Sequence, residues 1–545
     1  MTEDEIIPVE IAQNLGYITV GVHVDPMDWM QPSAQEMIKS VLAAVNNPNP
    51  EFRGNIILLH DSGGDRAGTV AVLPELIDQL RARGFHFVLV SKLAGLTREQ
   101  VMPRLEPTAM LYADRLVFLS LSWLGSVLYY CFIAAIFLGI GRLLLLCGLS
   151  LWNRRRAAAD EAPANIDTAI LVSVIIPAFN EERVIASTVA RILGSDYRNI
   201  EIIVVDDGSR DRTAEVVRQS FVAESKVTLI SVPNGGKAKA LNLGLTRATG
   251  DVVVALDADT EFDHDTISRL VRWFADPKVG AVAGNAKVGN RVNMITRWQA
   301  LEYIVAQNLE RRALAALGTL TVVPGAVGAW RRSALAEIGG FPADTLAEDQ
   351  DLTIALQRAG YLVRFDSSAV AWTEAPATVR GLAKQRFRWA YGTLQCLWKY
   401  SDITFNPRYK ALGLVALPQV WLFQILLTAL APVADLLLVW QLVTQWIAYS
   451  QHGAEFSNDN LYMVAIYYCV FMVVDLSAAV FGFLMEKRES WSLLWWLMLQ
   501  RFGYRQLMYY VVVRSISTAL GGAFVSWGKL ERAGTVRPRF NQRGT

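Results

Sequence analysis

The sequence contains few cysteines and almost no net charge. Its four cysteines, Cys131, Cys147, Cys396 and Cys469, have no paired spacing among the 545 residues. That pattern argues against a disulfide framework and against a zinc site. The formal net charge is +1, so no overall electrostatic field favours nucleic acid as a partner.

A secretory signal is also missing from the printed N-terminus. The segment "MTEDEIIPVEIAQ" has no basic start and no apolar core, which a signal peptide requires. Residues 1–115 therefore lack a visible means of export, although the chain could be an N-terminally shortened form of a longer bifunctional protein.

Long apolar runs are abundant instead. Apolar residues make up 52% of the chain, and the mean hydropathy is +0.27, which is high for a purely soluble protein. A helix needs about 20 apolar residues to cross a bilayer core. The runs 116–152, 411–449 and 461–484 satisfy this length, and 411–449 could form two helices broken at Pro432. Residues 491–527 predict an interfacial helix followed by a span near 506–526.

These runs predict a multi-pass protein of the cell (inner) membrane, with roughly four or five spans and transmembrane regions over 116–152 and 411–527. Basic residues follow the first run at 154–156 and form a tail over 528–545. Because basic flanks stay in the cytoplasm, the region between the spans should be cytoplasmic. Residues 1–107 should then lie outside, unless 116–152 form a hairpin that keeps both ends inside.

Residues 166–400 have the pattern of an α/β domain. Short apolar runs at 171–177, 200–205, 227–232 and 251–256 predict buried strands, and segments with helical periodicity separate them. This alternation predicts a parallel sheet that binds its ligand at the carboxyl ends of the strands.

Polar residues follow these predicted strands. Asp257 and Asp259 come after the fourth strand and provide hard oxygen ligands for Mg²⁺ or Mn²⁺, with a diphosphate completing the site. Asp206 and Asp207 follow the second strand, and "NGGKAKALN" places Lys237 before a helix, which suits a phosphate. Taken singly, each of these motifs could equally be a solvated turn, a helix cap or a plain glycine loop.

Two later motifs predict the remaining chemistry. Glu348, Asp349 and Asp351 lie close together, so repulsion between them could raise one pKa and create a general base. The alternative is an acidic helix N-terminus. In "GLAKQRFRWAYGT", Gln385, Arg388 and Trp389 share one helix face and suit a ligand with hydroxyls, an anionic group and a flat surface. A basic helix at a membrane surface is the alternative.

The order of the motifs carries more information than any one of them. N-E-E, D-D-G-S, G-K-A-x-A-L-N, D-A-D, G-N-x-x-V-G-N, E-D-x-D-L and Q-x-x-R-W, followed by apolar runs, resemble the membrane-bound family 2 glycosyltransferases over about residues 166–527. The stretches "GNAKVGNR" and "AEDQDLT" are most similar to poly-β-1,6-N-acetylglucosamine synthases and chitin-oligosaccharide synthases. The resemblance implies a GT-A type nucleotide-sugar-binding domain inserted between transmembrane helices.

The resemblance also implies a role for each matched residue. Asp207 would contact the uridine in a pocket lined by Ala178, Asn180 and Glu181, and Lys237 would bind the nucleotide sugar. The implied metal ligands are Asp257 and Asp259, and Asp257 also contacts the donor.

The implied catalytic residues are Asp349, Gln385, Arg388 and Trp389. Asp349 would deprotonate the acceptor, Arg388 would bind the diphosphate, and Trp389 would lie beneath the acceptor sugar. The implied partners are UDP-N-acetylglucosamine, a growing glycan, a lipid bilayer and accessory export or deacetylase subunits.

Residues 1–107 resemble the last third of chitooligosaccharide-type polysaccharide deacetylases. The matching active-site residues are Asp28 and His60. The T-F-D-D-G motif of that family is absent, and no two of the five histidines stand four residues apart. The resemblance therefore predicts a partial, inactive deacetylase-like α/β segment, and it implies that the polymerised sugar carries an N-acetyl group.

The preferred function is inverting polymerisation of an N-acetylglucosamine-type β-glycan. The alternatives are a non-processive transferase to a lipid-phosphate carrier and a synthase of another β-glycan, such as hyaluronan or cellulose. A membrane-anchored carbohydrate esterase and a non-catalytic sugar sensor fit the motifs less well.

Overall fold

The computed structural model describes residues 3–14, 17–49, 53–61, 66–101, 108–159, 169–452, 459–486 and 489–521. The chain divides into two compact units, Met1–Leu121 and Ser122–Thr545. The predicted basic tail over 528–545 lies outside the described residues.

The first unit is mainly helical in its described part. It contains α1 (Glu3–Asn14), η1 (Asp28–Met30), α2 (Ala34–Val45), α3 (Ala67–Ala82), α4 (Val90–Leu93) and α5 (Arg98–Val101). A small core of buried apolar side chains, including Val41, Val72 and Leu76, joins α2 to α3. The β pairing among the described residues of this unit is one parallel bridge between Val24 and Ile57. The deacetylase-like fold of this segment stays a prediction.

The second unit is built on an eight-stranded sheet. Its strands are β1 (Val172–Ala178), β2 (Ile200–Asp207), β3 (Val227–Val232), β4 (Val252–Ala255), β5 (Glu261–Phe262), β6 (Val279–Val288), β7 (Gly328–Arg331) and β8 (Leu362–Thr373), in the order β3-β2-β1-β4-β7-β6-β8-β5. The first four are the strands predicted from sequence. Side chains of β1 alternate between two cores, with Val174 and Ile176 in one and Ile175 in the other. Both faces of the strand are therefore buried, as its continuous apolar sequence requires.

The predicted parallel sheet is only partly correct, because beyond β4 the sheet is mixed, with β6 and β8 parallel and β7 and β5 antiparallel to their neighbours. Strands β1 to β4 pair in parallel, but β7 runs antiparallel to both β4 and β6. Ala255 at the end of β4 pairs with Gly328 at the start of β7. The loop that enters β7 therefore lies beside the turn that leaves β4, where the paired aspartates are.

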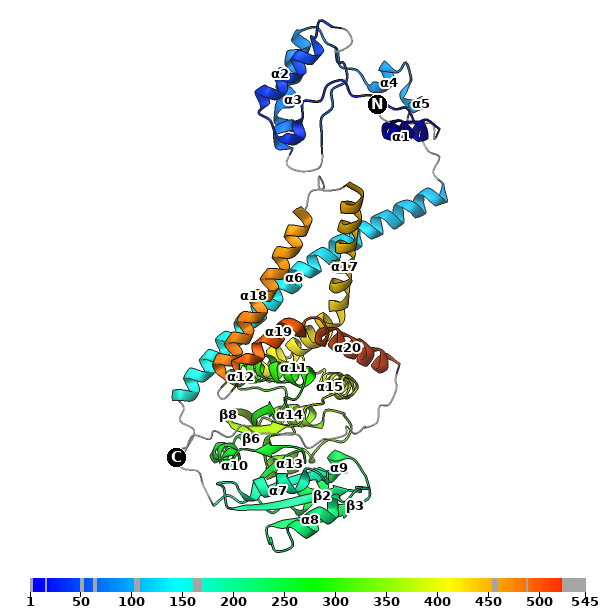
Figure 1. Ribbon diagram of the computed structural model, residues 1–545. Coiled ribbons are helices and arrows are strands. Elements are labelled where there is room, and N and C mark those ends of the chain that lie inside the picture. The colour runs from blue at the N-terminus through cyan, green and yellow to red at the C-terminus, as the bar shows by residue number, and fades with distance from the viewer. Residues whose placement is uncertain are drawn as a thin grey trace. The chain divides into compact units, whose positions relative to one another are not determined.

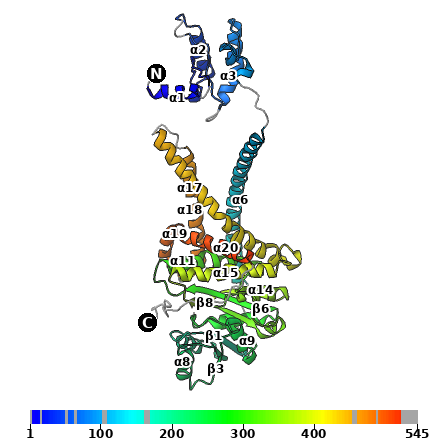
Figure 2. The same ribbon diagram turned by 90° about the vertical axis from the view of Figure 1, so that its right-hand side faces the viewer.

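Helices cover the sheet and separate it from the apolar helices. Helices α7 (Ile185–Leu193), α8 (Thr213–Ser220), α9 (Lys237–Arg247), α10 (Thr266–Val271), α13 (Arg332–Glu337) and α14 (Glu348–Arg358) lie around it (Figure 1). A further helical layer lies between the sheet and the long helices, as Figures 1 and 2 both show. It contains α11 (Met294–Glu302), the π-helical turn η4 (Tyr303–Asn308), α12 (Leu309–Ala316), α15 (Val379–Lys399), α19 (Trp495–Gln500) and α20 (Tyr504–Leu520).

Helix α20 (Tyr504–Leu520) covers the described part of the span expected near 506–526, and that span stays a prediction. Helix α20 ends at Leu520 and packs along α15, and residues 522–526 lie outside the described part. Val511 and Val512 on this helix are buried, whereas Tyr510, Val513 and Leu520 are exposed. Two arginines, Arg505 and Arg514, interrupt its apolar sequence.

Two described helices are long and apolar enough to cross a membrane, Tyr112–Arg155 and Leu412–Ile447. The first belongs to α6 (Ala109–Ala159), a single continuous helix, so the hairpin considered for 116–152 is wrong. The second ends in α17 (Leu427–His452), which continues through Pro432. The predicted break there is also wrong, because a proline removes one hydrogen bond and can bend a long helix without ending it. The remaining expected spans, including α18 (Asp459–Met485), stay predictions.

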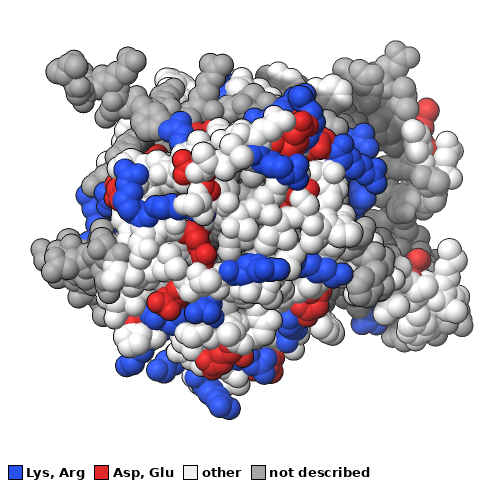
Figure 3. All heavy atoms as spheres, turned by 90° about the horizontal axis from the view of Figure 1, so that it is seen from below, with Lys and Arg blue, Asp and Glu red and all other residues white. Residues whose placement is uncertain are grey.

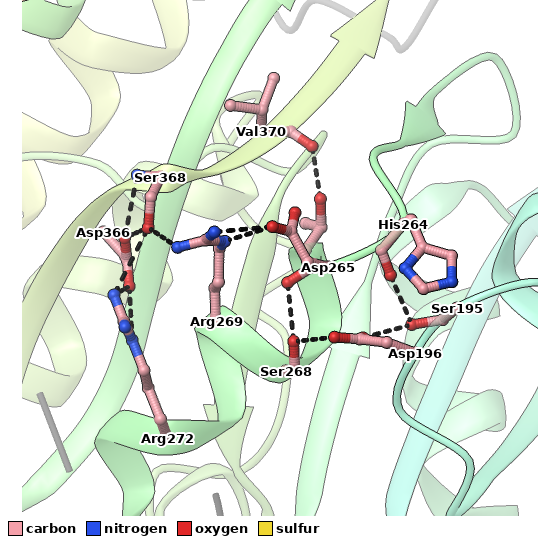
Figure 4. A network of polar contacts seen from close by, with 11 residues as sticks. Ser195, Asp196, His264, Asp265, Ser268, Arg269, Arg272, Asp366, Ser368 and Val370 are labelled. Carbon is pink, nitrogen blue, oxygen red and sulfur yellow. Dashed lines mark hydrogen bonds and ion pairs between the residues drawn. The ribbon is translucent and has the colours of Figure 1, made fainter. Parts of the chain in front are cut away.

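A polar network holds the chain just beyond the paired aspartates (Figure 4). Ser268 on α10 donates hydrogen bonds to Asp196 and to the Asp265 carbonyl, at 2.8 and 2.9 Å. Arg269 joins the Asp265 carboxylate to Ser368 on β8, at 2.7 and 2.9 Å. These contacts fix the segment that follows Asp259 against the strand β8.

The conspicuous "GNAKVGNR" segment has a structural role at the end of α18. Lys287 on β6 is 3.1 Å from the carboxylates of both Glu486 and Glu489, and all three side chains are buried. Glu486 also pairs with Arg312 at 2.7 Å and accepts a hydrogen bond from Asn285 at 3.0 Å. We call this group the β6–α18 ion cluster. These contacts bind the chain at the end of α18 to the sheet strand β6.

The face of the molecule in Figure 3 carries many charged side chains, unlike the apolar helices. Basic and acidic side chains are interspersed over it, without a large continuous area of one sign. Such a mixed surface is typical of protein in contact with water.

The β6–α18 ion cluster predicts a stability effect. Glu486→Ala leaves Lys287 and Arg312 buried without that carboxylate, which should lower the free energy of unfolding by about 3–5 kcal/mol. Thermal unfolding of the detergent-solubilised protein measures this loss. Glu337→Ala removes an exposed carboxylate that accepts one hydrogen bond, and should change stability by about 0.5 kcal/mol or less. Equal losses in the two variants would contradict the cluster's role.

Candidate active site

A cavity of about 600 Å³ opens at the carboxyl ends of β1, β2 and β4. Ten sequence-predicted residues line it, namely Ala178, Glu181, Asp207, Lys237, Asp257, Asp259, Asp349, Gln385, Arg388 and Trp389. The same cavity is also lined by residues of α6, α12, η7 (Val420–Leu426) and α20. One space therefore connects the strand ends to the apolar helices.

Asn180 is not among the residues that line this cavity, and its contact with the nucleotide stays a prediction. Its backbone is left-handed, with φ of 54°, in the turn after β1. Its Oδ1 accepts a hydrogen bond from the Arg210 amide at 2.7 Å, and its own amide donates to Ser209 Oγ at 2.9 Å. Asn180 therefore holds the "DDGSR" loop in place.

The glycine pair before α9 binds a carboxylate of the protein itself. The Gly235 amide donates to Asp207 Oδ1 at 2.7 Å, and the Gly236 amide donates to Asp207 Oδ2 at 2.9 Å. These amides were expected to suit a phosphate, but they are occupied by Asp207. A Cβ atom at Gly208 would lie 2.6 Å from the Asn234 amide nitrogen, so this approach of the two loops requires glycine. The loop thereby fixes Asp207 at the cavity edge.

Lys237 joins the two acidic motifs. Its Nζ lies 2.8 Å from Asp257 Oδ1 and 2.8 Å from Glu348 Oε1. Burial alone would lower the pKa of Lys237, but the charges of Asp257 and Glu348 outweigh it and raise that pKa above its ordinary value. The ammonium group is therefore permanently charged and compensates the acids around it.

Asp349 has the electrostatics of a base. Burial and the neighbouring charge of Glu348 raise the pKa of Asp349 to about 6, against the opposing effects of Lys237 and of two backbone amides. Those amides are from Gln350 at 2.8 Å and Gly325 at 3.3 Å, and Gly325 belongs to the loop entering β7. A carboxyl group with this pKa can take up a proton near neutral pH.

The other two acids of the motif, Glu348 and Asp351, form ion pairs or hydrogen bonds with other side chains. Glu348 pairs with Lys237, whereas Asp351 is fully buried and accepts hydrogen bonds from Tyr400 at 2.7 Å and from Lys399 at 2.9 Å. Asp351 does not line the cavity. The geometry therefore favours Asp349 among the three candidates.

Helix α15 places the third motif in the cavity wall. Gln385, Arg388 and Trp389 all line the cavity from this helix. A close approach fixes the helix there, because a Cβ atom on Gly392 would lie 2.7 Å from the Cβ of Ala347, just before Asp349. The glycine of "AYGT" thus lets α15 touch the start of α14.

Several cavity residues were not predicted from sequence. They include Glu302 and Tyr303 at the end of α11, Arg386 on α15, and Arg142, Glu310 and Phe423 near the apolar helices. Arg142 pairs with Glu310 at 2.8 Å. Of these residues, only Arg142 could have been suspected from the sequence. It interrupts the first apolar run, and charges within apolar helices commonly serve a function.

Asp257 and Asp259 have the donor chemistry for a divalent ion. Both carboxylates line the cavity from the turn after β4. Among the described residues, no group of three or more His, Cys, Asp or Glu side chains could hold a metal. Two carboxylates completed by phosphate oxygens are nevertheless a common way of binding Mg²⁺. The residues fit a metal that is bound together with a diphosphate.

Asp28 and His60, the two residues matched to the deacetylase active site, lie close together in the first unit. His60 Nδ1 lies 2.8 Å from Asp28 Oδ1, and Thr69 donates to Asp28 Oδ2 at 3.0 Å. Burial alone would raise the pKa of Asp28, but the hydrogen bonds from His60 and Thr69 lower it. No described group of three ligands accompanies the pair, so their role stays a prediction.

The Lys237 ion pairs predict a pH-dependent stability effect. Lys237→Met leaves the half-buried Asp257 and Glu348 without their cation, which should lower the free energy of unfolding by about 1–3 kcal/mol at pH 7, because solvent screens part of the charge. Lys237 stays charged below its raised pKa, so its contribution persists across the neutral range. Acidification should shrink the deficit, because protonation removes the uncompensated carboxylate charges. Thermal unfolding between pH 4 and 8 tests this, with exposed Lys226→Met as the control; a pH-independent deficit would contradict it.

Part of the second unit is similar in sequence to known glycosyltransferases. Residues 173–339 match the model of the glycosyl transferase family 2. The poly-beta-1,6-N-acetyl-D-glucosamine synthase of Staphylococcus aureus (strain COL) is 28% identical over 316 residues, which are 57% of this chain and 72% of the relative. The corresponding synthase of Staphylococcus epidermidis is 28% identical over 306 residues, 56% of this chain and 70% of its own.

Solved structures are more distant. A mannosyltransferase from Pyrobaculum calidifontis, in complex with GDP-Man and Mn²⁺, has 24% identity and a TM-score of 0.45, covering 67% of this chain and 98% of its own. Residues 1–349 of Staphylococcus aureus TarS, in complex with UDP-GlcNAc, have 18% identity and a TM-score of 0.30, covering 41% and 67%. The family match extends from β1 through the loop after α13 and contains Asp207, Lys237, Asp257 and Asp259, so the similarity covers the residues of the candidate donor site.

Proposed function

We propose that the chain is a membrane glycosyltransferase that polymerises an N-acetylglucosamine-type β-glycan from a UDP-sugar by inverting transfer. The observation that carries this proposal is the single cavity in which Asp257, Asp349 and Trp389 meet. Donor, base and acceptor groups thus share one space. The named activity of the staphylococcal relatives supports an N-acetylglucosamine polymer as the product.

The donor nucleotide would occupy the part of the cavity nearest β1 and β2, as in a GT-A type domain. Asp207 is held there by two glycine amides and can accept from a uracil N–H, with Ala178 and Glu181 beside it. Lys237 and Arg388 line the same cavity and supply positive charge for the diphosphate.

Asp257 and Asp259 would hold Mg²⁺ or Mn²⁺ together with that diphosphate. When bound, the ion neutralises charge that develops on the leaving UDP. Arg388, which lines the same cavity, would contribute to the same end, because a guanidinium can donate two hydrogen bonds to a phosphate.

The cavity suits a direct displacement with one base. Asp349 removes the proton from the acceptor hydroxyl while that oxygen bonds to the anomeric carbon and the bond to UDP breaks. Attack from the side opposite the leaving group inverts the configuration, so an α-linked donor gives a β-linked product. A single carboxylate suffices for this route, and no enzyme-bound sugar is needed.

Trp389 would seat the acceptor end of the glycan. An indole offers a flat apolar surface to a sugar ring, and the cavity continues from Trp389 to Phe423 and Gln424 beside the apolar helices. This continuation suits a chain that lengthens step by step. The apolar helices α6 and α17 would lie in the cell membrane with the catalytic domain on the cytoplasmic side, as the basic residues after the first run favour.

The first prediction from this proposal concerns donor and metal. Membranes containing the protein should convert UDP-N-acetylglucosamine into a β-linked polymer, and EDTA should abolish this because Asp257 and Asp259 need the ion to hold the diphosphate. Added Mg²⁺ or Mn²⁺ should restore it. Radiolabelled donor, product sizing and linkage analysis measure the outcome. Full activity in chelator would refute the metal role, and a single sugar on lipid phosphate would favour the non-processive alternative.

The second prediction concerns Asp349. Asp349→Asn keeps the shape of the side chain but removes the base, so turnover should fall by about 10²–10⁴-fold. UDP affinity should barely change, since Asp207, Asp257 and Asp259 remain. Because the pKa of Asp349 is about 6, the carboxylate form increases as the pH rises through that value. Wild-type turnover should therefore be about half-maximal near pH 6 and level off roughly one pH unit above it.

A matched control separates the base from general charge effects. Asp402→Asn removes an exposed acid that pairs with Arg358 at 3.0 Å and does not line the cavity. Its turnover and pH profile should match those of the wild type. Normal polymer from Asp349→Asn would show that the base is misassigned and would point to Glu348.

A further inference from the structure

Arg386 is a buried cation beside the tryptophan to which the proposed function assigns the acceptor. Its side chain is only 6% exposed, and it lines the cavity from α15. The Arg386 Cζ atom lies 4.3 Å from the centre of the Trp389 ring. The centres of the Tyr303 and Trp389 rings are 6.5 Å apart, and the two ring planes are tilted by 35°. The indole is therefore confined by two neighbours that also line the cavity.

Glu302 holds Arg386 in this position. Arg386 Nη1 lies 2.6 Å from Glu302 Oε1, and Tyr504 of α20 donates a hydrogen bond to Glu302 Oε2. Arg386 Nε and Nη2 are buried and have no hydrogen-bond partner among the described residues. The guanidinium therefore depends on Glu302 and on the indole face for its stabilisation.

The backbone at Glu302 brings these groups together. Helix α11 ends at Glu302, and the π-helical turn η4 begins at Tyr303. A π-helical turn widens the helix locally, and such turns often occur at functional sites. Here Glu302, Tyr303 and Gln307 all line the cavity from this part of the chain.

We propose that Arg386 and Glu302 are positioning residues for the acceptor: their ion pair, fastened to α20 through Tyr504, fixes the Trp389 ring on which the glycan end is seated. The inference rests on the proposed function and extends it. It makes acceptor binding, but not donor binding, depend on the docking of α20 against α15.

The contact between the Arg386 guanidinium and the Trp389 ring explains why acceptor binding should depend on Arg386. A guanidinium over an indole face is attracted by the ring, more strongly when both are shielded from water. Removal of the cation frees the ring to turn, so the surface offered to the sugar is lost for part of the time. Asp207, Asp257 and Asp349 do not contact Arg386 in the structure and keep their own partners.

The test is a comparison of acceptor and donor kinetics with N-acetylglucosamine oligomers of defined length. Arg386→Met keeps much of the side-chain volume without the charge, and it should raise the KM for the oligomer about tenfold. The KM for UDP-N-acetylglucosamine should change less than twofold, and more donor should be lost to hydrolysis per transfer. Arg386→Lys should restore part of the acceptor affinity because it restores the cation.

Two further variants decide the question if Arg386→Met does not fold. Glu302→Gln should raise the acceptor KM in the same way, and Tyr504→Phe should do so to a smaller degree. Combining Glu302→Gln with Arg386→Lys should give less than the sum of the separate effects, because both act through one ion pair.

The matched control is Arg297→Met. Arg297 lies on α11 with its Cζ atom 4.8 Å from the Trp496 ring centre, and it does not line the cavity. Its kinetics should equal those of the wild type. An equal rise in donor and acceptor KM for Arg386→Met and Glu302→Gln, or the same change in Arg297→Met, would overturn the positioning role. A wild-type protein that uses no UDP-sugar would overturn the proposed function as well.

Discussion

The Lys237 ammonium group allows the acidic residues of the cavity to coexist. Asp257 and Glu348 come from segments far apart in the sequence, and both lie 2.8 Å from its Nζ. Without a cation between them, carboxylates this close would repel one another. The cation compensates Asp257 and Glu348, while Asp349 keeps a pKa of about 6. One ion centre thus supports both a diphosphate site and a base.

The rest of the site depends on two close backbone approaches. Strand β7 enters antiparallel beside β4, which places the Gly325 amide on Asp349. Gly392 lets α15 approach Ala347, which brings the face of Gln385, Arg388 and Trp389 toward that acid. The first contact orients the proposed base directly, and the second acts through the backbone. Both decide whether groups from opposite ends of the domain can act on one substrate.

The sequence predicted the parts of the fold that periodicity determines. Strands β1 to β4 were predicted within one or two residues, because buried parallel strands are continuous apolar runs. Ten of the eleven predicted residues of the transferase site line one cavity. The antiparallel β7 could not be predicted, since four residues carry no sign of direction. The hydrogen bonds of Asn180 and of the glycine pair could not be predicted because their partners lie on other loops, and Glu302 was missed because an isolated acid in a helix has no distinguishing neighbours.

The central claim is that donor, base and acceptor groups meet in this one cavity. An experimental structure of the protein with UDP and a divalent ion tests it most directly. The account predicts uracil density beside Asp207, the ion between the diphosphate and the carboxylates of Asp257 and Asp259, and open space between the diphosphate, Asp349 and Trp389. Nucleotide density outside this cavity, or an ion held by other residues, would contradict it.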